Sequence, residues 1–384
     1  MSAVVIDLRS VEDQRDVVHR AVQALAEGGL VVFPTETVYG VAASALQPAA
    51  VERLVAVKGR QPNRPLTLAV KSPVEAMDYV PNMSALAQRL QRRCWPGPMT
   101  LVLPDDHPDS ATSLLAPSVR QVIVPSGTIG LRVPSHAVIQ DVLHLAPGPL
   151  VLTSANLSGQ PAAVTGNEAV QSLGETVDLI LDDGRCRFGQ ASTVVQVDGA
   201  KWKVLREGVL NRTTLRRLAS YMILLVCTGN TCRSPMAAAL MRRRLAKKLG
   251  TTEDQLEQQG LWVSSAGIAA MTGGRASPEA VTVMQERGLD LSAHESQPLS
   301  DRLVRFADLL LTMTRNHREA ILAQWPDAAA RTHVLGRQHG DVADPIGGSL
   351  EVYRRCADQI DSFLTPWIDE LDLGQIRETA ASGG

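Results

Sequence analysis

A cysteine and an arginine separated by five residues are the side chains of this sequence best suited to covalent chemistry. Cys227 follows a strand-length apolar run, Met222 to Val226, and Arg233 comes after a short polar loop. Backbone N–H groups of so short a loop can converge on one phosphate, and a helix N-terminus beside them favours a thiolate. Arg233 can bind two phosphate oxygens as a fork. The stretch predicts a strand, a phosphate-binding loop and a helix that opens at Ser234-Pro235.

The region 222–371 resembles the low-molecular-weight protein phosphatases, in which a thiolate attacks phosphorus and a carboxylic acid protonates the leaving group. The resemblance implies that Cys227 is the nucleophile, Arg233 the phosphate binder and Asp344 the general acid, with no cofactor. It also implies a doubly wound, four-stranded parallel sheet with the site at the strand C-termini. The loop residues that it assigns to phosphate contact and specificity are Thr228, Gly229, Asn230, Thr231, Cys232 and Ser234.

Within that family the loop is most similar to the protein-arginine phosphatases, because Thr231 stands where tyrosine-directed members usually carry a larger aliphatic residue. The aromatic residue that those relatives carry two positions after the acid is here Ile346. We therefore expect a phosphoprotein substrate that carries phosphoarginine, with phosphotyrosine as the alternative and a phosphate-binding pseudo-enzyme as the rival. Cys232 either forms a reversible disulfide with Cys227 or is simply buried.

Polar stretches at the ends of apolar runs in the first half of the chain suit a charged small molecule. Lys58, Arg60 and Arg64 bring three cations within seven residues, which suits either a triphosphate or a solvated helix end. Ser154 and Asn156 point the same way on an extended turn, where they bind a ligand or cap the turn. Each stretch alone is ambiguous.

Together these stretches resemble the threonylcarbamoyl-AMP synthase (YrdC/Sua5-like) family over about residues 8–210. The resemblance implies synthesis of threonylcarbamoyl-adenylate from L-threonine, bicarbonate and ATP, for transfer to tRNA by a partner machinery. Mg²⁺ would arrive with ATP, and no residue is assigned to a metal site. The implied threonine ligands are Thr35, Arg132 and Ser192. The implied ATP ligands are Lys58, Arg60, Arg64, Thr128, Ser154, Asn156 and Arg206. The rival interpretation is a non-enzymatic RNA-binding or regulatory module.

Alternating helical and strand patterns predict an α/β fold in both halves, with a large mixed sheet in the first. We expect a synthase domain over 1–210, a partly helical linker over 211–221, a phosphatase domain over 222–372 and a disordered tail over 373–384. Strands are predicted at 30–33, 66–70, 99–103, 122–124, 129–133, 149–153, 178–181 and 193–197 in the first domain. The second domain has predicted strands at 222–226, 261–264, 308–313 and 331–335, and a last helix from 349 that Pro366 should kink or break.

Composition narrows the class of protein. The 384 residues are 45% hydrophobic and 20% charged, with a net charge of −2, which argues against a generally nucleic-acid-coating protein. Five scattered cysteines, the lack of an apolar leader and the lack of a membrane-length apolar run favour a cytoplasmic protein. Histidines 294, 317, 333 and 339 have no metal-ligand spacing, so we expect them on the surface or at helix caps.

Overall fold

The computed structural model describes residues 2–59 and 65–383. The chain divides into two compact units. The N-terminal unit is Met1–Leu215 with Ser382–Gly384, and the C-terminal unit is Arg216–Ala381. The boundary falls inside helix α8 (Arg212–Ala219), so the expected linker is largely helical.

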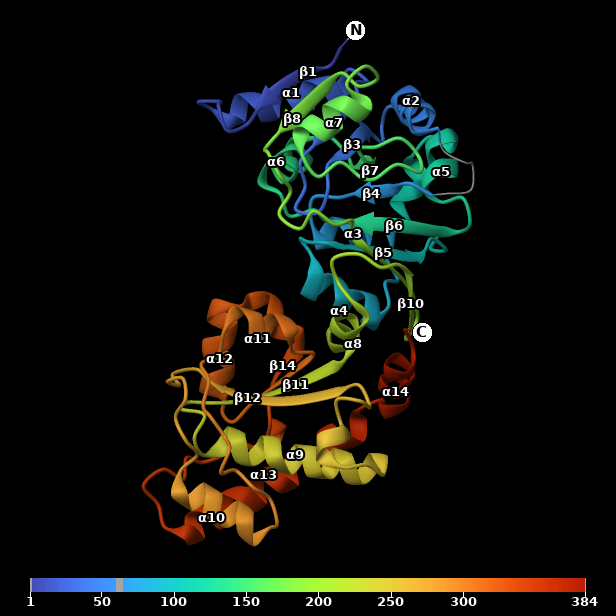
Figure 1. The fold of residues 1–384 in the computed structure, drawn as a ribbon. Helices are drawn as coiled ribbons and strands as arrows, with labels where there is room; N and C mark the ends of the chain where they lie inside the picture. The colour runs from blue at the N-terminus through green and yellow to red at the C-terminus, as the bar shows by residue number, and fades with distance from the viewer. Residues whose placement is uncertain (1, 60–64, 384) are drawn as a thin grey trace. The chain divides into compact units, whose positions relative to one another are not determined.

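The N-terminal unit is built on one mixed sheet, as its alternating sequence pattern predicted (Figure 1). In the described part of the chain it has ten strands in the order β1-β8-β2-β3-β7-β4-β6-β5-β9-β10. The strands are β1 (Val4–Asp7), β2 (Val31–Phe33), β3 (Gly40–Ser44), β4 (Thr67–Ala69), β5 (Met99–Pro104), β6 (Thr128–Arg132), β7 (Leu150–Ser154), β8 (Leu179–Asp182), β9 (Thr193–Asp198) and β10 (Lys201–Arg206). The central strands are buried, which explains their nearly continuous apolar sequences.

Helices cover this sheet and bury its apolar side chains. They are α1 (Gln14–Ala26), α2 (Pro48–Lys58), α3 (Pro73–Tyr79), α4 (Ala85–Cys94), α5 (Pro117–Ile123), α6 (Ala137–Leu145) and α7 (Gly166–Leu173), with a 3-10 turn η1 (Ala111–Leu114). One core packs α1 and α6 against strands β2, β3, β7 and β8. Asp13 begins α1 by accepting a hydrogen bond from the Arg15 amide, a side-chain cap that is independent of tertiary contacts.

The C-terminal unit contains a four-stranded, all-parallel sheet, so the predicted fold class of this half is also confirmed. Its strands are β11 (Tyr221–Cys227), β12 (Leu261–Gly267), β13 (Leu309–Thr312) and β14 (Thr332–Val334), in the order β12-β11-β13-β14. Alternate residues of β11 enter different cores. Ile223 and Leu225 lie in the core under helix α9 (Arg233–Leu249), whereas Leu224 and Val226 lie in the core under α11 (Asp301–Phe306) and α12 (Arg315–Gln324).

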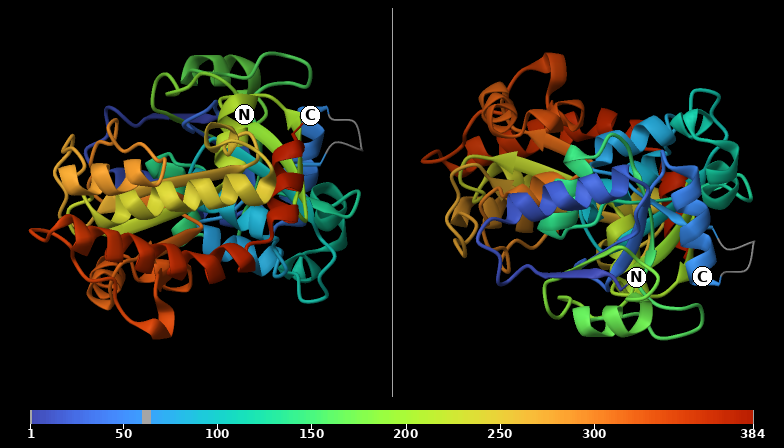
Figure 2. Two further views of the ribbon diagram at one scale, coloured as in Figure 1. Left: turned by 90° about the horizontal axis from the view of Figure 1, so that it is seen from below. Right: turned by 90° about the horizontal axis from the view of Figure 1, so that it is seen from above.

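Helices therefore lie on both faces of this sheet (Figure 1). They are α9 (Arg233–Leu249), α10 (Pro278–Glu286), α11 (Asp301–Phe306), α12 (Arg315–Gln324), α13 (Leu350–Glu370) and α14 (Leu373–Ala381), with 3-10 turns η2 (Glu253–Gln255), η3 (Pro326–Arg331) and η4 (Arg337–His339). Helices α9 and α13 lie side by side on one face, seen as the yellow and red helices in the left view of Figure 2. No helix among the described residues is long and apolar enough to span a bilayer.

Three expectations about local structure are wrong. The apolar run 122–124 ends helix α5 rather than forming a strand, because Pro117 opens a helical turn that buries Val119 and Ile123. The break that Pro366 was expected to cause does not occur in helix α13, since burial of the side chains that follow it offsets the missing hydrogen bond. The expected disordered tail is helix α14 as far as Ala381, because its apolar face includes the buried side chain of Ile376.

Candidate active sites

One pocket in the N-terminal unit gathers the residues predicted to bind ATP and threonine. Its volume is about 650 Å³, within the range of small-molecule sites. It lies across the consecutive strands β3, β7, β4, β6, β5, β9 and β10, where residues two apart on a strand share a face. The predicted residues that line it are Thr35, Lys58, Thr128, Arg132, Ser154, Asn156, Ser192 and Arg206. Two more predicted ATP ligands, Arg60 and Arg64, lie outside the described residues.

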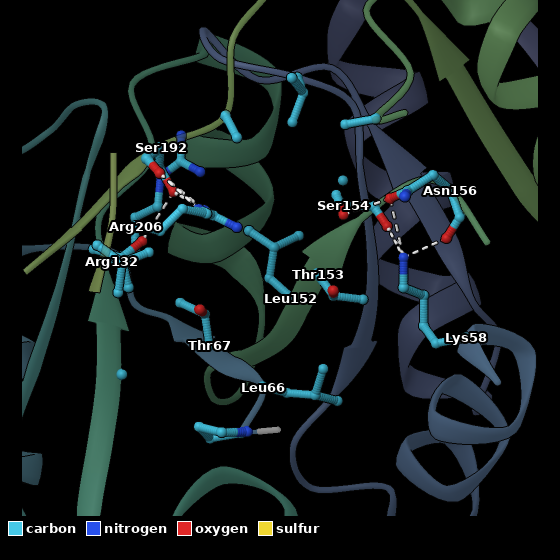
Figure 3. A pocket seen from close by; sticks show the side chains of 18 of the residues that line it. Lys58, Leu66, Thr67, Arg132, Leu152, Thr153, Ser154, Asn156, Ser192 and Arg206 are labelled. Carbon is cyan, nitrogen blue, oxygen red and sulfur yellow. Dashed lines mark hydrogen bonds between the residues drawn. The ribbon is translucent and has the colours of Figure 1, made fainter. Parts of the chain in front are cut away.

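Lys58 and the turn after β7 form one end of this pocket (Figure 3). Lys58 ends α2 and is almost fully buried. Its ammonium donates to the Ser154 carbonyl at 2.7 Å, to the Asn156 carbonyl, and to Asn156 Oδ1 at 3.1 Å. Ser154 Oγ donates to the same Oδ1 at 2.5 Å. Lys58 thus fixes the Ser154-to-Asn156 turn, and a phosphate oxygen can bind the ammonium by displacing one of these protein oxygens.

A buried ion pair forms the opposite end. Arg132 Nη2 donates to Glu36 Oε1 at 2.6 Å and to Thr37 Oγ1 at 2.8 Å, and Glu36 Oε2 accepts from the Ser135 amide at 2.9 Å. Burial opposes ionisation of Glu36, but the charge of Arg132 and these hydrogen bonds outweigh it and hold the pKa of Glu36 below its ordinary value. Arg132 Nε has no hydrogen-bond partner among the described residues, so it keeps a donor for a ligand.

A second arginine lies beside this pair. Arg206 Nη2 donates to the Ser192 carbonyl at 2.8 Å and to Ser192 Oγ at 3.0 Å. Burial, and then the charge of Arg132, lowers the pKa of Arg206. Figure 3 shows these residues across the pocket from Lys58, with Leu152 and Thr153 between the two groups. Two desolvated guanidinium groups at one end favour an anionic ligand group there, such as a carboxylate.

The predicted loop of the C-terminal unit wraps around Cys227. Asn230 adopts a left-handed backbone with a φ of 56°, which asparagine tolerates better than most residues. Its carboxamide donates to Ser234 Oγ at 2.8 Å and to Ser265 Oγ at 2.9 Å. The backbone amide nitrogen of Asn230 lies 3.3 Å from Cys227 Sγ, and Ser234 Oγ lies 3.0 Å from the same sulfur. Both groups can donate to a thiolate at the N-terminus of α9.

The predicted phosphate binder and the predicted general acid form an ion pair that contacts this loop at Thr228. Arg233 Nη2 pairs with Asp344 Oδ2 and also donates to Thr228 Oγ1 at 3.2 Å. Arg233 is buried, whereas the Asp344 side chain is 40% exposed, so the acid lies at the mouth of the site. A bound phosphate would compete with Asp344 for the guanidinium, and would free the carboxyl group for proton transfer.

The remaining loop residues lie around the same centre. Thr231 is half-buried, and its carbonyl accepts from the Ser277 amide at 2.9 Å. Cys232 is buried as a free thiol, with its sulfur 3.3 Å from the Tyr353 hydroxyl; Cys227 is also a free thiol. Gly229 leaves the turn between Thr228 and Asn230 without a side chain. The described residues contain no cluster of three or more His, Cys, Asp or Glu able to hold a metal ion.

Comparison with known proteins assigns each half of the chain. The Sua5/YciO/YrdC family model, described as "Telomere recombination", matches residues 23–208. The model of the low molecular weight phosphotyrosine protein phosphatases matches residues 222–376. The chain belongs to both families. It is a fusion of a Sua5-like synthase unit and a low-molecular-weight phosphatase unit, and both are enzyme families.

Individual relatives agree with this division. A protein-arginine-phosphatase of Geobacillus stearothermophilus is 37% identical over 159 residues, 40% of this chain and 99% of the relative. A Mycobacterium leprae relative, provisionally named as a threonylcarbamoyl-AMP synthase, is 40% identical over 191 residues, 49% of this chain and 81% of the relative. The threonylcarbamoyl-AMP synthase of Pyrococcus abyssi is 33% identical over 188 residues, 48% of this chain, and this chain spans only 52% of its length.

A solved structure of P. abyssi Sua5 complexed with L-threonine shares the fold. Its TM-score is 0.51 at 21% identity, covering 69% of this chain and 92% of that one.

Two histidines of the phosphatase unit contradict the expectation that they serve only as surface or capping residues. His294 Nε2 donates to the Asn230 carbonyl at 2.7 Å and so supports the left-handed turn. His317 is 5% exposed, and its Nε2 lies 2.9 Å from Thr228 Oγ1. His339 is exposed, as expected. Sequence spacing could not place His294 and His317 at the loop, because they lie 64 and 89 positions after the loop residues that they contact.

Acid should destabilise the phosphatase unit through His317. Burial, and then the charge of Arg233, lowers the pKa of His317 from 6.5 to about 4. Between these values the unfolded chain binds the proton and the folded chain does not, so stability falls as the pH drops from 6.5 towards 4. The difference corresponds to about 3 kcal/mol in free energy of unfolding. Amide hydrogen exchange of β11 and β13 should report this loss, and His317→Gln should remove it; equal pH slopes in both proteins would contradict it.

Proposed function

We propose that the synthase unit makes L-threonylcarbamoyl-adenylate from L-threonine, bicarbonate and ATP, and releases diphosphate. The observation that carries this proposal is the pocket that brings together eight of the predicted substrate ligands. Its product would serve the threonylcarbamoyl modification of tRNA, with the transfer step performed by partner proteins. We place the protein in the cytoplasm, where these substrates are available.

The polarity of the pocket suits these reactants. The carboxylate of threonine fits between Arg132 and Arg206, and the threonine hydroxyl can reach Ser192 or Thr35. The phosphates of ATP, with their Mg²⁺, fit the other end at Lys58, Ser154 and Asn156. The threonine amine and bicarbonate condense to a carbamate with loss of water. A carbamate oxygen then attacks the α-phosphorus, and diphosphate leaves. No side-chain nucleophile is needed, so catalysis rests on positioning and charge neutralisation.

The test of the synthase is product formation by the intact chain. Mass spectrometry should detect threonylcarbamoyl-adenylate only when threonine, bicarbonate, ATP and Mg²⁺ are all present, and Lys58→Ala should suppress it. A folded protein that yields no product under conditions where a bacterial relative does so would contradict the proposal. RNA binding without ATP consumption, unchanged by Lys58→Ala, would instead support a non-enzymatic RNA-binding module.

We propose that the phosphatase unit hydrolyses phosphoproteins through a cysteinyl-phosphate and prefers phosphoarginine. Cys227 attacks phosphorus, Arg233 binds the equatorial oxygens and Asp344 protonates the leaving nitrogen or oxygen. The preference rests on Thr231 and on the arginine-directed relative, which spans nearly the whole unit. The curated relatives also include a tyrosine-directed name, so phosphotyrosine is the alternative substrate. Ile346, two positions after the acid, is exposed and departs from the aromatic residue of the arginine-directed relatives, so the preference does not rest on it.

The Thr231 hydroxyl should control this preference. We expect Thr231→Ile to lower kcat/KM for phosphoarginine at least tenfold while kcat/KM for phosphotyrosine stays equal or rises. Isoleucine replaces the hydroxyl group of this half-buried side chain with a larger, apolar ethyl group. Thr231→Ser, which keeps the hydroxyl, is the matched control and should retain the preference. A parent chain that already turns over phosphotyrosine faster would overturn the assignment to phosphoarginine.

A further inference from the structure

His317 is placed at the phosphatase centre by the topology of the sheet. Strands β11 and β13 are parallel neighbours, with Val226 paired to Thr312, so their C-terminal ends meet at one edge. Cys227 ends the first strand, and α12 begins just after the second. Thr314 caps α12 by accepting from the His317 amide at 3.2 Å, which places His317 in the first turn of the helix, at this edge of the sheet.

The imidazole of His317 contacts the phosphate-binding loop directly. His317 Nε2 lies 2.9 Å from Thr228 Oγ1, and Arg233 Nη2 donates to the same oxygen at 3.2 Å. Arg233 Nη2 also pairs with Asp344. The Thr228 hydroxyl therefore lies between His317 and the side of the centre where the general acid meets the leaving group.

The position of the proton on His317 follows from what surrounds the ring. The ring is neutral at ordinary pH, since burial and the charge of Arg233 lower its pKa, against the opposing charges of Asp344 and Asp341. Nδ1 is buried and has no hydrogen-bond partner among the described residues. A buried N–H group without an acceptor is costlier than a lone pair without a donor. The proton therefore lies on Nε2, which donates to Thr228 Oγ1.

The Thr228 hydroxyl is left with one role. Its oxygen accepts from both His317 and Arg233, so both lone pairs are used and only its O–H remains. Thr228 is exposed at the mouth of the site, one residue after the nucleophile, so that O–H can reach a bound group.

We propose that His317 is a positioning residue of the phosphatase, which makes the Thr228 hydroxyl a fixed donor to a non-bridging oxygen of the phosphoryl group. This inference rests on the phosphatase activity proposed above. It adds to the loop amides and to Arg233 a side-chain donor that a histidine outside the loop controls. A preoriented donor lowers the barrier because its orientation costs nothing during the reaction.

Four single variants and one double variant of the full-length chain test this inference with para-nitrophenyl phosphate as substrate. We expect Thr228→Val and His317→Leu each to lower kcat about ten- to a hundredfold with little change in KM. The double variant should be no slower than the slower single variant, because His317 acts through Thr228. Thr228→Ser keeps the hydroxyl and His317→Gln keeps an N–H donor at a similar reach, so both should retain most activity. Losses that multiply in the double variant, or a His317→Leu enzyme within twofold of the parent, would overturn the inference.

The affinity for orthovanadate separates this inference from the proposed activity. Vanadate occupies the phosphoryl site without turnover, so Thr228→Val and His317→Leu should each weaken its binding, and the double variant should weaken it no further. A merely structural His317 would lower the thermal stability of the unit and leave vanadate affinity in the folded fraction unchanged, which contradicts the inference. An inactive parent chain contradicts the phosphatase assignment itself, and vanadate affinity then decides the role of His317 alone.

Discussion

Cys227→Ser should lower the phosphatase kcat by at least about 10⁴-fold, while the fold of the unit is unchanged. The sulfur lies at the N-terminus of α9, within hydrogen-bond distance of the Asn230 backbone amide and the Ser234 hydroxyl. This arrangement stabilises a thiolate and has no comparable effect on an alcohol. Serine occupies nearly the same volume, so packing in this core is preserved. Hydrolysis of phosphoarginine and of para-nitrophenyl phosphate by the full-length chain gives the measurement.

Cys232→Ser is the matched control for this loss. Its sulfur contacts Ser277 Oγ at 3.4 Å and the Tyr353 hydroxyl at 3.3 Å, and serine can keep both contacts. This variant should stay within a few-fold of the parent under reducing conditions. Threonylcarbamoyl-adenylate formation should be unchanged in both variants, since no cysteine is among the described residues that line the synthase pocket. Substantial residual activity in Cys227→Ser would mean that another group attacks phosphorus.

The phosphatase loop could be predicted from sequence because its members are neighbours in the chain. The spacing of Cys227 and Arg233, with an apolar strand before them and Ser234-Pro235 after them, is enough to predict a strand, a short loop and a helix N-terminus. The supporting contacts could not be predicted, because they depend on which strand ends meet at one sheet edge. The pairs His317–Thr228 and Arg233–Asp344 are separated by 89 and 111 positions.

The synthase pocket shows the opposite case. No single stretch of it carried an unambiguous signal, and only the resemblance joined Lys58, Arg132 and Arg206 into one site. The structure adds Glu36, whose carboxylate could have been suspected as the partner that an arginine inside an apolar strand requires. Three strands were missed for physical reasons. Strands β1 and β10 are the two edge strands of the sheet and have a weak apolar pattern, and β3 consists mostly of small residues with low strand propensity.

Arg132→Met should abolish threonylcarbamoyl-adenylate synthesis and should also destabilise the synthase unit by about 3–5 kcal/mol. Both Arg132 and Glu36 are less than a tenth exposed, so removing the guanidinium leaves a buried carboxylate that has backbone amide donors but no counter-ion from Arg132. Burial then raises the pKa of Glu36, whereas in the parent it is lowered. The destabilisation should therefore be larger at pH 7.5 than at pH 5, where the carboxyl group can take up a proton. Amide hydrogen exchange of β6 and β4 measures it.

Adding Glu36→Gln to Arg132→Met separates structure from chemistry. The carboxamide that replaces the Glu36 carboxylate is neutral and still accepts from the Ser135 amide, so the double variant should recover most of the lost stability and lose its pH dependence. Synthesis should stay absent, because the donor for the threonine carboxylate is still missing. Isothermal titration with L-threonine should show binding in the parent and none in either variant. Recovery of activity together with stability would show that Arg132 serves only as the counter-ion of Glu36, and would remove it from the threonine site.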